Sequence, residues 1–416
     1  MSVGEGTDAS LAVESARKPK ARVVGKMGRH QVQERKEDVH PDRAQLTSEG
    51  KAGALRMGRD LPEEFKAADH IGVWATALPR SGETYLTAAE AAKGGDDAKV
   101  LERVEGWRQA EGEVMNWGAD ESGSMPHYTE TDYLSWRTGK KLVKGDKLGE
   151  SRETNEDTPY AKAVKEAVAK KQGLRWMVEQ SDALAVDPEN GADPSARSFS
   201  TYAGVGAGIL LHQARSLYPN LTEVAQKDKK DMTAARLVGS HAMITECLLI
   251  AAARRVAERD GGDPNQAAED ILRGIEARNK DGMFKPGETI DYEITGDPQS
   301  PEIVIRYEGL ELRLTVADLE AIYIQGYAQA DGIVDRNAGQ LPQQAEYEAE
   351  SSRHDFSPAG KEASRKALQA LDKAKSEAHG RLIWKTSLIP PERFYDMLNS
   401  ELAKKGLPTY LDADGI

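Results

Sequence analysis

Four residues in three separate segments could together handle a phosphate group. Arg29 and His30 end a short apolar segment at residues 21–30, Arg80 follows a second apolar segment, and His241 ends a third. Imidazole is a competent nucleophile, and a pKa of about 6.5 leaves it largely neutral at physiological pH. The planar fork of arginine binds two phosphate oxygens at once. In one pocket, these side chains would supply both a nucleophile and charge stabilisation for phosphoryl transfer.

The elements that would position these residues alternate between strand and helix. Each apolar segment is followed by a helical pattern, which predicts an α/β fold with a mostly parallel sheet and helices on both faces. The carboxyl ends of parallel strands meet at one edge of a sheet, so the three segments can converge there. The expected strands are residues 21–30, 71–77 and 235–241, and the expected helices are residues 47–61, 82–92 and 242–257.

The order of these motifs resembles the histidine phosphatase (phosphoglycerate mutase-like) superfamily. The resemblance consists of Arg-His followed by Leu-Thr-x-x-Gly at residues 46–50, then Leu-Pro-Arg-x-x-x-Thr at 78–84, then Ser-His at 240–241. It implies that His30 is the residue that becomes phosphorylated. It also implies that Arg29, Arg80 and His241 bind the phosphoryl group, with His241 part of the catalytic set.

One position of this chain departs from the superfamily pattern, and one role in that pattern has several candidate residues. The superfamily usually has glycine directly after the first histidine, whereas Gln31 stands there and is expected to place its carboxamide beside the phosphate. The resemblance also implies a carboxylic general acid after Arg80. Spacing favours Glu105 over the other candidates, which are Glu111, Glu102, Glu113, Asp120 and Glu121.

The chain is expected to divide into three parts, the second of which contains an insertion. Residues 1–20 are polar and predict a disordered arm, and residues 21–330 would form the phosphatase-like domain. A helical cap is expected in an insertion at about 94–220, and residues 331–416 predict a helical appendage. Period-two alternation within residues 290–314 predicts antiparallel strands at one edge of the sheet.

Composition limits the classes of partner. The 416 residues carry a net charge of −13, which argues against nucleic-acid and membrane partners but allows a small phosphorylated substrate or a phosphopeptide. The single cysteine, Cys247, lies in an apolar helical stretch, and no run of about 18 apolar residues predicts a membrane span. A cytoplasmic protein is therefore expected, and its oligomeric state stays open. The histidines outside the motifs lack metal-ligand spacing, so neither a metal nor a cofactor is expected.

Three functions are compatible with these residues. The first is a phosphomonoesterase that works through a phosphohistidine on His30. The second is a phosphoglycerate mutase-like phosphotransferase that uses the same residues. The third is a binding or scaffold protein on a phosphatase fold, with weak or no activity.

Overall fold

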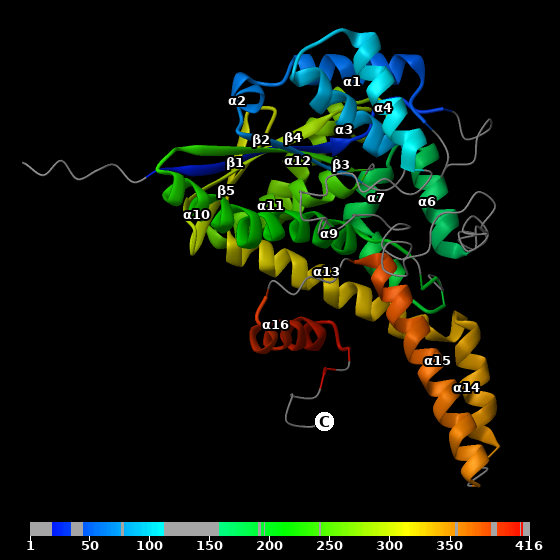
Figure 1. Cartoon of the computed structure of the whole chain (residues 1–416). Coiled ribbons are helices and arrows are strands. Elements are labelled where there is room, and N and C mark those ends of the chain that lie inside the picture. The colour runs from blue at the N-terminus through cyan, green and yellow to red at the C-terminus, as the bar shows by residue number, and fades with distance from the viewer. Residues whose placement is uncertain are drawn as a thin grey trace, which may run out of the picture.

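A six-stranded mixed sheet forms the centre of the computed structural model, in the order β2-β3-β1-β4-β5-β6 (Figure 1). The strands are β1 (Ala21–Arg29), β2 (His70–Ala75), β3 (Met232–Ser240), β4 (Thr289–Asp297), β5 (Ser300–Tyr307) and β6 (Leu310–Thr315). The structure describes residues 19–34, 45–75, 79–111, 158–189, 193–194, 196–240, 243–353, 357–383, 389–407 and 409–410.

The pairing of the strands confirms the α/β class but not a mostly parallel sheet. β1, β2 and β3 pair in parallel, whereas the pairings β1–β4, β4–β5 and β5–β6 are antiparallel. The antiparallel edge expected at residues 290–314 is confirmed. Its cause is local: Glu308 and Gly309, with φ of 49° and 82°, form a two-residue turn between β5 and β6, and such a turn joins only antiparallel strands.

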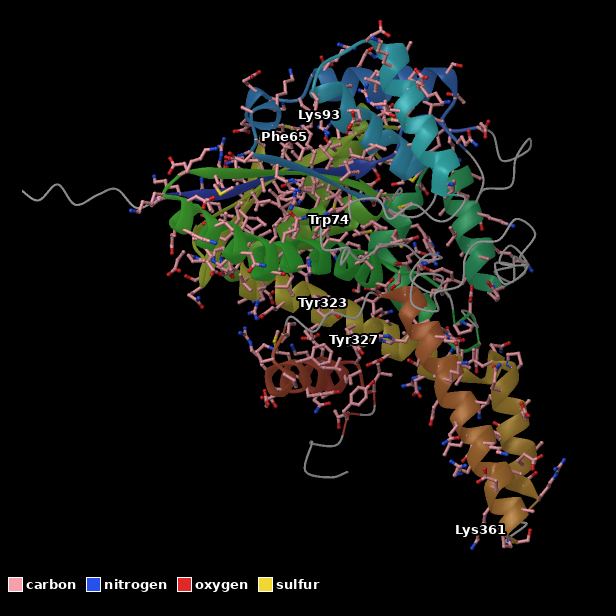
Figure 2. All side chains as sticks on the ribbon, in the orientation of Figure 1. Phe65, Trp74, Lys93, Tyr323, Tyr327 and Lys361 are labelled. Carbon is pink, nitrogen blue, oxygen red and sulfur yellow. The ribbon has the colours of Figure 1, made fainter. Side chains whose placement is uncertain are left out.

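The first face of the sheet is covered by short helices that follow β1 and β2. They are α1 (Ser48–Arg59), α2 (Glu63–Lys66), α3 (Pro79–Ala92) and α4 (Asp97–Glu111). Val24, Val73 and Leu237 from the sheet form a buried cluster with Phe65 and Tyr85 from these helices, and Figure 2 labels Phe65 on this side. The hydroxyl of Thr47 accepts a hydrogen bond from the Gly50 N–H at 3.1 Å and caps α1, so the start expected for the helix at residues 47–61 is confirmed.

The second face carries the larger core. The helices of this layer are α9 (Phe199–His212), the π-helical turn η2 (Gln213–Leu217), α10 (Tyr218–Asp228), α11 (Ile244–Arg259), α12 (Pro264–Arg278) and α13 (Val316–Arg336). Trp74, labelled in Figure 2, and Cys247 are buried in this core. A Cβ atom on Gly204 of α9 would lie 2.9 Å from the Cα of Gly326 in α13. Gly204 therefore allows α9 and α13 to pack closely.

The insertion between β2 and β3 also includes α6 (Pro159–Ala169), α7 (Gly173–Glu179) and α8 (Ser181–Ala185). Leu174 and Trp176 of α7 belong to the larger core, and so does much of α9. The carboxyl-terminal half of the insertion is therefore part of the core that supports the sheet. Residues 112–157 of the cap expected at about 94–220 fall outside the described residues, as does most of the expected arm at residues 1–20.

The C-terminal part is helical, as expected, and continues from the main core. It contains the single turn η3 (Ala338–Gln340), α14 (Pro342–Ser352), α15 (Pro358–Leu382) and α16 (Pro391–Lys404). α14 and α15 form a hairpin that projects from the body, with Lys361 near its tip (Figures 1 and 2). α13 runs across the expected boundary at residue 330, and Ile333, Ala378 and Leu382 are buried in the larger core. Among the helices that the structure describes, none is both long enough and apolar enough to cross a membrane.

Candidate active site at the carboxyl edge of the parallel strands

The parallel strands bring the first histidine and the second arginine to one edge of the sheet. β1 ends at Arg29, which lies opposite Ser240 at the end of β3, and the His30 N–H donates to the Ser240 carbonyl at 3.3 Å. Arg80 is the second residue of α3, which begins after the neighbouring strand β2. The arrangement agrees with the expected convergence of strand ends, although only three of the six strands contribute to it.

A glycine at the end of β3 allows α3 to come close to this edge. A Cβ atom on Gly239 would lie 2.6 Å from Ser81 Oγ and 2.7 Å from Tyr85 Cδ2, both on α3. These separations are shorter than real Cβ contacts, so a side chain at position 239 would push α3 away from the sheet. Gly239 therefore contributes to the placement of Arg80 beside His30.

The hydrogen bonds of His30 define its tautomer. Its Nδ1 lies 2.7 Å from the carbonyl oxygen of Gln31, and its Nε2 lies 3.2 Å from Nε of Arg80. A carbonyl oxygen can only accept and a guanidinium N–H can only donate, so Nδ1 carries the proton and Nε2 presents its lone pair. Nε2 is thus the nucleophilic atom of the ring, and it faces Arg80.

The surroundings of His30 keep it uncharged. Only 6% of the residue is exposed, and burial is the main reason why its pKa falls from 6.5 to about 3. The hydrogen bond to the Gln31 carbonyl opposes this fall, and the charges of Arg80 and Arg29 add to it. The imidazole is therefore neutral throughout the physiological pH range.

Arg29 approaches the same edge from the second face of the sheet. Its Nη1 donates to the carbonyl of Phe284 at 2.7 Å, and its buried Nε has no hydrogen-bond partner within the described part of the chain. The positive charge of Arg29 lowers the pKa of both His30 and Glu246, which places the guanidinium near both groups. Arg29 is thus a cation with donor capacity beside the neutral imidazole.

Glu246 is a buried carboxylate that the sequence analysis did not single out. Its Oε2 accepts from the Met243 N–H at 2.9 Å and its Oε1 accepts from the Phe284 N–H at 3.2 Å. It therefore joins the start of α11 to the loop that holds Arg29. Complete burial raises its pKa, while these hydrogen bonds and the charge of Arg29 act in the opposite direction. A glutamate three residues into a helix signals a capping role, and that signal was present in the sequence.

Two further residues of α3, Thr84 and Glu83, bind the backbone of segments near the site, and the sequence did not predict these contacts. Thr84 is fully buried, and its Oγ accepts from the Gln31 N–H at 3.0 Å and donates to the Arg80 carbonyl at 2.8 Å. Glu83, 4% exposed, accepts from the Leu46 N–H at 2.9 Å and so fixes the segment that leads into α1. The sequence marked Thr84 as the last residue of the Leu-Pro-Arg-x-x-x-Thr motif, whereas its only signal for Glu83 was a position three residues after Arg80.

Gln31 does not lie where the sequence analysis expected it. Its carboxamide sits between Gly53 of α1 and Gly287, where added Cβ atoms would approach it to 2.5 and 2.1 Å. The side chain lines a cavity of about 320 Å³ together with Lys26 and Arg56, and neither His30 nor Arg80 lines this cavity. The expectation that the carboxamide borders the phosphate is therefore wrong, because the backbone directs it toward α1.

Several predicted site residues cannot be placed. His241 lies outside the described residues, as do Glu113, Asp120 and Glu121. Glu105 and Glu111 belong to α4, but their side chains are outside the described part, while Glu102 is exposed. Within the described residues, no group of three or more His, Cys, Asp or Glu side chains could hold a metal ion. The geometry therefore brings together Arg29, His30 and Arg80.

The chain matches no protein-family model, and no match to a curated protein or to a solved structure was found. The resemblance to the histidine phosphatase superfamily therefore stays a prediction that depends on the motifs.

Proposed function

We propose that this protein hydrolyses phosphomonoesters through a phosphohistidine intermediate on His30. The observation that carries the proposal is the pairing of a neutral imidazole, protonated on Nδ1, with Arg80 at its Nε2. The substrate would be a small phosphorylated molecule or a phosphopeptide.

The first step would transfer the phosphoryl group to the protein. The lone pair of His30 Nε2 attacks phosphorus, the bond between phosphorus and the ester oxygen breaks, and a general acid gives a proton to the leaving oxygen. A phosphoryl oxygen would replace Nε2 as the acceptor for Arg80. Arg29 and His241 would bind the other oxygens, and Glu105 is the proposed acid.

The second step would release the product. Water attacks the phosphorus, the P–Nε2 bond breaks, and the bonding pair returns to Nε2 as inorganic phosphate leaves. The proposed acid would now act as the base that takes the water proton. Throughout both steps the Gln31 carbonyl holds the Nδ1 proton, so the ring alternates between nucleophile and leaving group without changing its tautomer.

One observation favours a second candidate, a phosphate-binding protein of this fold with weak or no turnover. His30 is 6% exposed and its Nε2 already accepts from Arg80, so a phosphoryl group must displace that contact before attack. A site in which this displacement is unfavourable would bind an anion through its arginines and stop there.

Hydrolysis of an aryl phosphate by the full chain, with EDTA present, tests the proposal. Rapid quenching with alkali should trap phosphate on the protein, and the label should be lost in acid, as for a phosphoramidate. His30→Asn should abolish both hydrolysis and labelling, while His70→Asn, at the exposed start of β2, should change neither.

The possible outcomes separate the two candidates. Binding of inorganic phosphate without turnover or labelling would favour the binding protein. Turnover that survives in His30→Asn and requires a divalent metal would contradict the phosphohistidine mechanism.

A further inference from the structure

A closed ring of hydrogen bonds links His30 to Gln31, Thr84 and Arg80. The ring begins at His30 Nδ1, which donates to the Gln31 carbonyl, and continues from the Gln31 N–H to Thr84 Oγ. Thr84 Oγ donates to the Arg80 carbonyl, and Arg80 Nε returns to His30 Nε2. Every polar atom of the imidazole and both backbone polar groups of Gln31 are thus used in one cycle.

In this ring, only Thr84 makes both of its hydrogen bonds through one atom, its hydroxyl Oγ. Its hydroxyl donates four residues back along α3, which is a local contact that threonine often makes in helices. The hydrogen bond that the hydroxyl accepts from the Gln31 N–H, 53 residues away in the sequence, is not local. The hydroxyl therefore joins the start of α3, which carries Arg80, to the segment after β1, which carries His30.

We propose that Thr84 is a positioning residue that holds the His30 ring and Arg80 in register for phosphoryl transfer. The inference rests on the proposed function. Without the hydroxyl, the Gln31 N–H loses its partner, so the backbone dihedrals of Gln31, which set the direction of its carbonyl in the next peptide plane, are less restrained. The Gln31 carbonyl would then no longer fix the proton on Nδ1, and Nε2 would no longer present its lone pair to the phosphorus.

A neighbouring threonine provides a matched control. Thr87 is also fully buried and lies one turn further along α3, but its Oγ has no hydrogen-bond partner within the described residues. Thr84→Val and Thr87→Val each replace a buried hydroxyl with a methyl group of nearly equal volume. Only the first substitution breaks the ring. Thr84→Ser keeps the hydroxyl and should restore the wild-type behaviour.

The tautomer of His30 is measured by the ¹⁵N chemical shifts of its imidazole in the full chain. The wild-type protein, Thr84→Ser and Thr87→Val should all show one tautomer with the proton on Nδ1. Thr84→Val should show a mixture of both tautomers. For an aryl phosphate, its kcat should fall about 10- to 100-fold with a smaller change in KM, since misplacement of reacting groups mainly affects the chemical step.

Two outcomes would overturn the inference. One is a single Nδ1-protonated tautomer in Thr84→Val, and the other is an equal loss in Thr87→Val, which would indicate packing alone. If Thr84→Val does not fold, Thr84→Ala, which leaves room for water, takes its place with the same criteria. An inactive wild-type protein would contradict the proposed function, whereas the ¹⁵N shifts would still decide the role of Thr84.

Discussion

Replacement of His30 by asparagine should make the stability of the protein less sensitive to acid. In the folded chain the pKa of His30 is about 3, because burial disfavours the imidazolium, whereas in the unfolded chain it returns to 6.5. Between these two values the unfolded state binds a proton that the folded state does not. His30 therefore contributes stability above about pH 6.5, and this contribution is lost as the pH falls toward 3.

The size of the effect follows from the same two values. Over a fall from about pH 6.5 to about pH 4.5, proton uptake by the unfolded state lowers the free energy of unfolding by about 2 kcal/mol. Asparagine does not titrate, so His30→Asn lacks this loss. Carboxylates that titrate in the same range are common to both proteins, and their effects cancel in the difference.

Urea unfolding followed by circular dichroism at the two pH values gives the comparison. The wild-type protein should lose about 2 kcal/mol more stability than His30→Asn over this range. His70→Asn, which replaces an exposed histidine, should behave like the wild-type protein. Equal losses in wild-type and His30→Asn would refute the reasoning, because they would mean that His30 titrates as freely in the folded state as in the unfolded one.

Three further predictions follow from the same structure. Arg80→Ala should lower kcat by about 10²- to 10³-fold in a phosphatase assay, with little change in melting temperature, because Arg80 acts as a donor to the transferring group; a large fall in melting temperature with a matching loss of activity would instead indicate a structural ion pair. Gln31→Gly should keep phosphatase activity within a few-fold but lower the melting temperature, since its carboxamide packs between Gly53 and Gly287 and not beside His30; a tenfold fall in kcat in the folded variant would contradict this placement. Removal of residues 331–416 should leave a chain that does not unfold cooperatively in calorimetry, because Ile333 and Leu382 complete the larger core; a sharp transition in the shortened chain would show that this core is complete without them.

The sequence was sufficient to predict the elements around the candidate site, because local patterns control them. Apolar runs end at Arg29 and before Arg80, and each run forms a parallel strand whose end lies at the same edge. Thr47 followed by Gly50 marked the start of α1, since a capping hydroxyl needs only nearby backbone. The antiparallel strands at the other edge follow from their alternation and a two-residue turn.

The tertiary structure decided the protonation, the tautomer and the side-chain directions of the residues at the site. The pKa of His30 depends on burial and on charges from other segments, and its tautomer depends on the Gln31 carbonyl and on Arg80. Gln31 turns its side chain toward α1 because two glycines from distant segments leave space for it there. Thr84 belongs to the Leu-Pro-Arg-x-x-x-Thr motif, but only the fold brings the Gln31 N–H to its hydroxyl. Spacing along the chain indicates which residues can share an edge, but burial and hydrogen bonding across the fold determine which atom holds a proton and which presents a lone pair.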